Sequence, residues 1–169
     1  MNAIGTCDDV NITISIIIND IATPTGLGTQ SFCDSATIAD LSATGTNILW
    51  YEEATGGTAL SPTDALVNGE NYFATQTDAV TGCESSVRLE VNVIINPLPN
   101  SGTPSSPLTV CDNNTSVDLL TGLDGSQEAT GTWFDTDSTV ALSGTSFDAS
   151  LVSTGSYQFT YTVTGSPPC

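Results

Sequence analysis

The stretch CDSATIADLSATGTNILWY, residues 33–51, decides the fold because a version of it returns later in the chain. It begins with a Cys-Asp pair, continues through an apolar run and closes on the aromatic pair Trp50-Tyr51. The same order recurs from Cys111-Asp112 through Val117–Leu120 to Trp133-Phe134. The two Cys-Asp pairs are 78 residues apart (111 − 33), and a recurrence of this kind predicts repeated domains.

A second class of cysteine, Cys7, Cys83 and Cys169, recurs with a similar period, at separations of 76 (83 − 7) and 86 (169 − 83). Residues 7–19 also repeat the pattern of residues 83–96, in which a cysteine and an acidic residue precede a long alternating run. We therefore interpret the chain as a segment of a longer tandem array. Its expected parts are the C-terminal strand of a preceding repeat (1–19), a complete repeat (20–97) and a second repeat that lacks its final strand (98–169).

Strand signals in the complete repeat come about every 8–12 residues, separated by Gly and Asn turns, and no helical apolar stripe is present. The expected strands are Gln30–Phe32, Thr37–Leu41, Ile48–Glu52, Ala59–Leu60, Ala65–Val67, Asn71–Thr77 and Ser86–Ile95. This pattern predicts an all-β chain of immunoglobulin-like antiparallel β-sandwiches arranged end to end. In such sandwiches Trp50 and Trp133 would be core tryptophans, and Tyr72 and Tyr157 would be tyrosine corners.

Charge excludes several classes of function. The 169 residues hold 19 acidic side chains, one basic side chain and no histidine, for a net charge of −18. Nucleic acids and anionic membranes are bound through clustered Lys and Arg, so we expect neither as a partner. Without histidine the commonest general base is missing, and we expect no enzyme. No run approaches the ~18 apolar residues of a membrane span, so we expect no direct membrane insertion.

Acidic clusters raise the question of a metal site. Asp8-Asp9, Asp112–Asn114 and Asp135–Asp137 offer the oxygen ligands that calcium prefers, but none fits the EF-hand spacing. A solvated acidic surface explains them better, because it keeps a long fibre soluble and self-repelling. We therefore expect no cofactor and leave a calcium site in these loops open.

Residues 28–96 resemble the immunoglobulin-like repeats of giant surface adhesins of Flavobacteria and other Bacteroidota. The resemblance rests on Cys33–Leu41, Ile48–Tyr51, Ala54–Leu60, Asn71–Phe73 and Gly82–Ser85. Residues 98–169 keep the cysteines and the aromatic pair but have a longer insert before Trp133 and no counterpart of Gly56-Gly57. The family includes adhesins of gliding motility that are exported by the type IX secretion system. The resemblance thus implies an extracellular protein at the bacterial cell surface.

Two functions follow as expectations. The first is a structural stalk or spacer in a long adhesin or extracellular fibre, whose partners are the neighbouring repeats of the same chain. The alternative is an ancillary module that binds carbohydrate or protein through loops such as Ala54–Thr58 or Gly122–Thr130. The absence of aromatic residues from Gly122–Thr130 favours the stalk. The resemblance also implies O-glycosylation at Asp-Ser motifs, which makes Ser35 and Ser138 candidates.

Export predicts oxidised cysteines, and two pairings stay open. Counting within repeats pairs Cys33 with Cys83 and Cys111 with Cys169, and leaves Cys7 alone. Immunoglobulin-like geometry separates Cys33 from Cys83 by a strand length, ~17 Å, which is too far for a disulfide. That geometry narrowly favours a bridge from Cys33 to Cys169 across the junction of two repeats, with Cys7, Cys83 and Cys111 left for partners beyond the chain.

The same frame predicts head-to-tail self-association. One copy carries an unpaired strand in residues 7–19, and another carries a sandwich in residues 98–169 that lacks one. Donation of the first to the second is therefore expected when the chain is studied in isolation.

Overall fold

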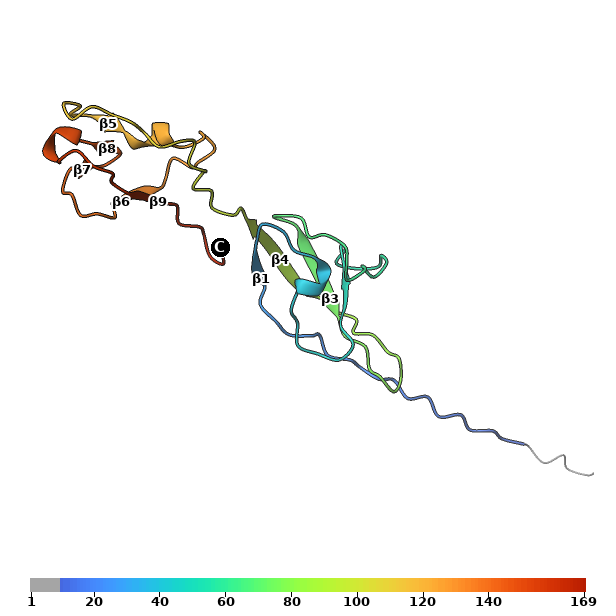
Figure 1. Ribbon diagram of the computed structural model, residues 1–169. Coiled ribbons are helices and arrows are strands. Elements are labelled where there is room, and N and C mark those ends of the chain that lie inside the picture. Colours follow the sequence, from blue (N-terminus) through green and yellow to red (C-terminus); the bar gives the residue numbers. More distant parts are fainter. Residues whose placement is uncertain (1–9) are drawn as a thin grey trace, which may run out of the picture.

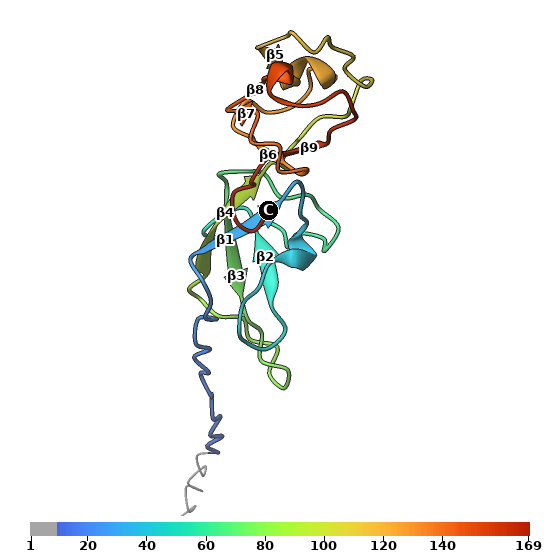
Figure 2. The ribbon, with the colours of Figure 1, turned by 60° about the vertical axis from the view of Figure 1, so that its left-hand side comes forward.

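The computed structural model describes residues 10–169, whose strands fall into two parts with separate cores (Figure 1). We call residues 22–97 the N-terminal part and residues 98–169 the C-terminal part. The two lie one beyond the other in both views, and the last residues of the chain return to the N-terminal part beside β1 (Figure 2). All secondary structure in the described residues is strand or short 3-10 helix.

The N-terminal part is built on one four-stranded sheet with the order β1-β4-β3-β2. The strands are β1 (Thr29–Cys33), β2 (Leu49–Tyr51), β3 (Asn71–Thr75) and β4 (Leu89–Asn96). β3 pairs antiparallel with both β2 and β4, whereas β1 pairs parallel with β4, from Thr29 opposite Asn92 to Cys33 opposite Asn96. The expectation of purely antiparallel pairing is therefore wrong at this edge. A strand joined to its neighbour by a long connection can run in either direction.

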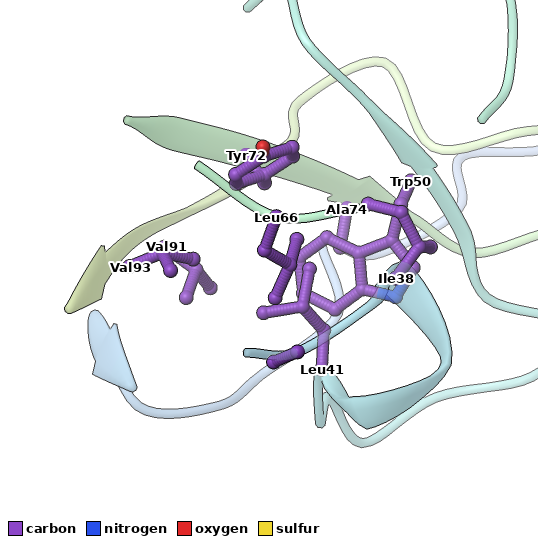
Figure 3. Close-up of a cluster of buried hydrophobic side chains, with 9 residues drawn as sticks. Ile38, Leu41, Trp50, Leu66, Tyr72, Ala74, Val91 and Val93 are labelled. Atoms are coloured by element: carbon purple, nitrogen blue, oxygen red, sulfur yellow. The ribbon is translucent and has the colours of Figure 1, made fainter. Parts of the chain in front are cut away.

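The core of this part lies between the sheet and a covering segment. Alternate residues of β4, Val91 and Val93, are fully buried, as the period of a strand requires. The indole of Trp50 packs among Ile38, Leu41 and Leu66 (Figure 3). Trp50 thus occupies the core, as the sequence predicts.

The covering segment forms less strand than expected. Thr37–Leu41 is wrong as a strand, because Ile38–Asp40 form the 3-10 helix η1. The carboxylate of Asp40 accepts hydrogen bonds from the Thr37 amide at 2.7 Å and the Thr37 hydroxyl at 2.9 Å, and such local bonds compete with a strand ladder. Residues 65–67 contribute a single bridge, Thr37 to Ala65, and Ala59–Leu60 form no strand. The second layer of the sandwich is thus reduced to loops and one helical turn.

The C-terminal part has two small antiparallel sheets. One contains β5 (Val117–Asp118), β7 (Leu142–Ser143) and β8 (Ser146–Phe147), in the order β5-β8-β7. The other pairs β6 (Thr132–Asp135) with β9 (Phe159–Thr162). The 3-10 helices η2 (Leu119–Gly122) and η3 (Ala149–Leu151) complete it. Its core is smaller, with only Leu119, Ala141, Phe147 and Ala149 buried.

Two segments predicted to be strand or core differ from expectation. Trp133 packs against the second core but is only half-buried. Residues 10–18 form no strand, because nothing in the described residues pairs with them. Both observations point to incomplete packing in this chain.

Candidate functional site

The junction between the two parts is covalent. Cys33, the last residue of β1, forms a disulfide with Cys169, with the Cα atoms 5.2 Å apart. Asn96, which lies opposite Cys33 in the sheet, donates from its side-chain amide to the carbonyl of Pro167 at 2.7 Å. The end of the β1–β4 pair is thereby held against the last turn of the chain.

This connectivity is the second of the two pairings that the sequence left open. Cys83 is half-buried and free, and Cys111 is exposed and free, so neither within-repeat bridge is present. Cys7 lies outside the described residues. The strand-length argument explains the result, because Cys33 ends β1 whereas Cys83 lies in the connection between β3 and β4.

Arg88, the one basic side chain of the chain, organises a second cluster. Its guanidinium lies 3.6 Å from the centre of the Tyr51 ring and donates to the carbonyl oxygens of Glu53 at 2.6 Å and Gly56 at 2.8 Å. Gly57, with a φ of +74°, packs so closely against Glu53 that a side chain would collide with its carboxylate. This cluster fixes the shape of the loop formed by residues 53–57.

Tyr51 links the cluster to Glu84. Its hydroxyl donates to Oε1 of Glu84 at 2.8 Å. Burial and then the Glu84 carboxylate raise the pKa of Tyr51, whereas hydroxyl groups from Thr75 and Tyr51 lower the pKa of Glu84. Both shifts move the pKa of the group away from neutral pH, toward the protonated phenol for Tyr51 and the ionised carboxylate for Glu84.

Both predicted tyrosine corners bond back to the chain before them. The Tyr72 hydroxyl accepts from the Val67 amide at 3.0 Å, and the Tyr157 hydroxyl donates to the Ser153 carbonyl at 2.6 Å. Tyr72 is buried in the core, and Tyr157 packs at the edge of the second one. These contacts hold the loops that precede the central strands.

A groove of about 980 Å³ opens into the C-terminal part. Its lining residues come from segments 101–110, 117–123 and 155–161, together with Trp133 and Phe147. Every one of its lining residues is uncharged, although the chain carries 19 acidic side chains. Its volume is of a size to receive a peptide segment.

The acidic candidates for calcium do not converge. Oδ2 of Asp135 accepts from the Thr139 hydroxyl and the Val140 amide, and Oδ2 of Asp137 accepts from the Gln158 amide. In residues 10–169 no three His, Cys, Asp or Glu side chains lie close enough to hold one metal ion. Asp112 lies in an exposed turn, and Asp8-Asp9 fall outside the described residues.

The two glycosylation candidates share one local setting. Ser35 and Ser138 are both exposed and lie outside strands, where an enzyme can reach them. Asp34, with a φ of 65°, precedes Ser35, and Ser138 itself has a φ of 55°. Each serine thus lies at or next to a residue with left-handed backbone.

The candidate binding loops lack the side chains of a sugar site. Residues 54–58 are Ala-Thr-Gly-Gly-Thr, and residues 122–130 also contain no aromatic ring on which a sugar could stack. Asp124 is occupied in bonding Thr103 and Ser126, and these hydroxyl groups hold its pKa well below the usual range. These two loops are braced by internal bonds.

Residues 22–97 match the family model described as "Ig-like domain CHU_C associated". This part of the chain is therefore similar to Ig-like domains of the type found in Bacteroidota surface proteins. Together with the disulfide, this similarity supports an extracellular location. No curated protein and no solved structure matches the chain. In the described residues, no helix has the length and apolarity needed to cross a membrane.

Sequence reasoning missed two parts of this arrangement. The stacking of Arg88 on Tyr51 could have been anticipated from the sequence, since Arg88 is the only basic side chain and Tyr51 belongs to an aromatic pair in the same repeat. The groove also had a signal, because the Ig-like domain buries two valines of β4 and residues 98–169 offer no such strand of their own. Neither signal specifies side-chain geometry, so the structure was needed to place both.

Proposed function

We propose that the chain consists of spacer repeats of a long bacterial surface adhesin or extracellular fibre that serves gliding motility or surface attachment. In this proposal residues 20–97 and 98–169 are successive Ig-like sandwiches, the second without its final strand, and residues 1–19 belong to a preceding repeat. The repeats carry no catalytic group and need no cofactor. Export by the type IX system would deliver them to the cell surface.

The observation that supports this proposal best is the disulfide between Cys33 and Cys169. A bridge between repeats, rather than within one, fixes the position of one repeat relative to the next. The proline-containing linker Asn96–Asn100 acts in the same sense, because proline restricts the backbone at the junction. A module that only displays a binding loop needs neither device.

In-frame deletion of residues 20–97 from the intact surface protein tests the proposal. We expect shorter fibres by electron microscopy, with adhesion retained by cells that display the protein at an unchanged level. The control replaces residues 20–97 with an unrelated sandwich domain of similar length, which should restore both length and adhesion. Loss of adhesion in the replacement strain, at normal display, would instead assign a binding role to this domain.

A further inference from the structure

The groove of the C-terminal part lies where the Ig-like domain has a strand. In the N-terminal part β4 lies between β1 and β3. Residues 107–111 stand in the position of β1, 78 residues later, but form no strand and expose Leu108 and Val110. β9 pairs only with β6 among the described residues and therefore has a free edge. Residues 107–110 and β9 both line the groove, and their counterparts in the N-terminal part, β1 and β3, both pair with β4.

Residues 10–19 have the sequence that this gap requires. Their sequence is VNITISIIIN, beside VRLEVNVIIN at residues 87–96, which contain β4. At this offset of 77 (87 − 10), Ile14 and Ile16 take the positions of Val91 and Val93, both fully buried in the sheet. Yet the apolar side chains of Val10, Ile12, Ile14, Ile16, Ile17 and Ile18 are between 81 % and 91 % exposed. Exposed strands of this composition associate with free sheet edges.

We propose that a second copy of this chain fills the groove with residues 10–19, which enter as a strand between residues 107–111 and β9. The strand runs antiparallel to β9 and parallel to residues 107–111, as β4 runs relative to β3 and β1. Transfer of the β1–β4 register sets Ile16 opposite Leu108 and Ile18 opposite Val110. These are the two exposed apolar side chains of residues 107–111.

Residues 10–19 of the same chain cannot reach the groove. The chain enters the N-terminal part at the end where Thr25 pairs with Thr44 and where Gln76 bonds the Ala22 carbonyl. That end is opposite to the junction at Cys33 and Cys169, and residues 10–20 lead away from it in both views (Figures 1 and 2). The few residues between Asp20 and Thr25 are too short to return past the whole domain. Because donor and acceptor surfaces differ, each copy can both give and receive, and the assembly grows head to tail.

Charge also selects this occupant. Residues 10–19 carry no charge, and neither do the residues that line the groove. A partner with basic or acidic side chains would lose hydration there without gaining an ion pair. The remainder of each copy is strongly acidic, so association should strengthen as salt screens the repulsion.

The disulfide of the junction supplies a check on the register. When residues 10–19 act as β4 of the acceptor, the donor's own N-terminal part becomes the next repeat. Cys111 of the acceptor then stands where Cys33 stands, and Cys83 of the donor stands where Cys169 stands. These are the two cysteines that are free within the described chain. With oxidised glutathione as the oxidant, the two thiols lose two protons and two electrons and form the disulfide, while the glutathione disulfide is reduced to two thiols.

Sedimentation of the 169-residue chain, from micromolar to millimolar concentration in about 0.5 M salt, measures the assembly. We expect a series of oligomers that shifts to monomer when Ile14→Glu places a charge in the groove, with association weakened at least about 100-fold. Thr13→Glu is the matched control. It adds the same charge one residue away, at the position of Glu90, whose side chain is exposed on β4, and it should associate like the unaltered chain. Both substitutions lie in an exposed segment, so neither threatens folding.

Cross-linking then tests the register with two single-site chains, both in a Cys7→Ser background. One also carries Cys111→Ser and keeps Cys83, and the other also carries Cys83→Ser and keeps Cys111. In a glutathione redox buffer, a mixture should give a covalent dimer on non-reducing gels, neither chain alone should give one, and Ile14→Glu in the Cys83 chain should abolish it. A strictly monomeric chain at millimolar concentration, or oligomers that persist unchanged with Ile14→Glu, would overturn the proposal. A cross-link that ignores Ile14→Glu would overturn the register.

Discussion

Arg88 is the only basic side chain in a protein of net charge −18, and it stabilises one loop of the N-terminal part. Among 19 acidic side chains it bonds two backbone carbonyls and covers the face of Tyr51. A guanidinium suits this position because it is planar, stacks on a ring and donates along several directions at once. Arg88 therefore stabilises the loop of residues 53–57 through its contacts with backbone carbonyls and with the Tyr51 ring.

Arg88→Lys tests whether planarity matters in that position. We expect the N-terminal part to lose about 1 kcal/mol of unfolding free energy, because an ammonium neither stacks on Tyr51 nor spans both carbonyls. Arg88→Ala should cost about 2 kcal/mol, since it also removes the bonds of a charged donor. Urea unfolding followed by Trp50 fluorescence, in a Trp133→Phe background, gives both values. Exposed Val87→Ala is the neighbouring control and should change little.

Asp40 makes the covering segment sensitive to acid. Hydrogen bonds from the Thr37 amide and then from its hydroxyl lower the pKa of Asp40 below the usual value of an aspartate. A carboxylate whose pKa is lower in the folded than in the unfolded state stabilises the fold at pH values above its unfolded-state pKa. This stabilisation is lost as the pH falls through the folded-state pKa. Asp40→Asn should therefore lower the urea midpoint at pH 7. The difference from the unaltered chain should begin to shrink below about pH 4 and vanish below the folded pKa. Glu52→Gln, at a side chain that bonds nothing in residues 10–169, should show no such pH-dependent difference.

Among the elements, β4 contributes most to the sheet and the core of the N-terminal part. It joins β1 to β3, and its inward residues Val91 and Val93 are completely buried. Its outward residues meet solvent, and Ile94 is 37 % exposed. Loss of a strand with one fully packed face would therefore leave a cavity in the core.

Val93→Ala should destabilise the N-terminal part by about 2 kcal/mol, from two lost methyl groups and the cavity that they leave. Ile94→Ala, one residue along and on the opposite face, should cost less than about 1 kcal/mol because its side chain already contacts water. Urea midpoints of the two variants at equal slope provide the comparison. Equal losses would mean that the two faces of β4 are packed alike.

The elements that the sequence predicted well are those with strong alternation. β1, β2, β3 and β4 all lie within the expected segments or a residue or two beyond them, because burial of one face imposes the period of two. The segment Thr37–Leu41 failed because a carboxylate three residues away offers the Thr37 backbone a partner that hydropathy does not register. The parallel direction of β1 could not be read from the sequence either, since alternation is the same in both directions.

For the candidate site, the repeat spacing located the cysteines but could not decide between two pairings. The decision depended on which end of the domain each cysteine occupies, and that is a property of the assembled sheet. Likewise, counting strands indicated a gap in residues 98–169, whereas the uncharged lining of the groove emerged only from side-chain placement.

At the scale of the whole molecule, the disulfide between Cys33 and Cys169 couples two cores that share few other contacts. Spin labels placed at exposed residues of each part, for example Thr58 and Ser150, measure that coupling through their distance distribution. We expect a narrow distribution for the oxidised chain and a broad one for Cys33→Ser, with unchanged circular dichroism because neither core cluster contains Cys33 or Cys169. A narrow distribution in Cys33→Ser would assign the coupling to the linker instead.

The same bridge changes how the chain would respond to mechanical load. A pull applied between Val10 and Cys169 passes from Cys169 directly to Cys33, and the 136-residue span between them carries none of the tension. The extensible contour is then about 85 Å instead of about 570 Å, at about 3.6 Å per residue. Both cores are mechanically bypassed, and β1 is the one strand in the line of force. Under load, only the segment from Val10 to Cys33 would be stretched. Reduction of the Cys33–Cys169 disulfide would add about 490 Å of chain that can then be extended.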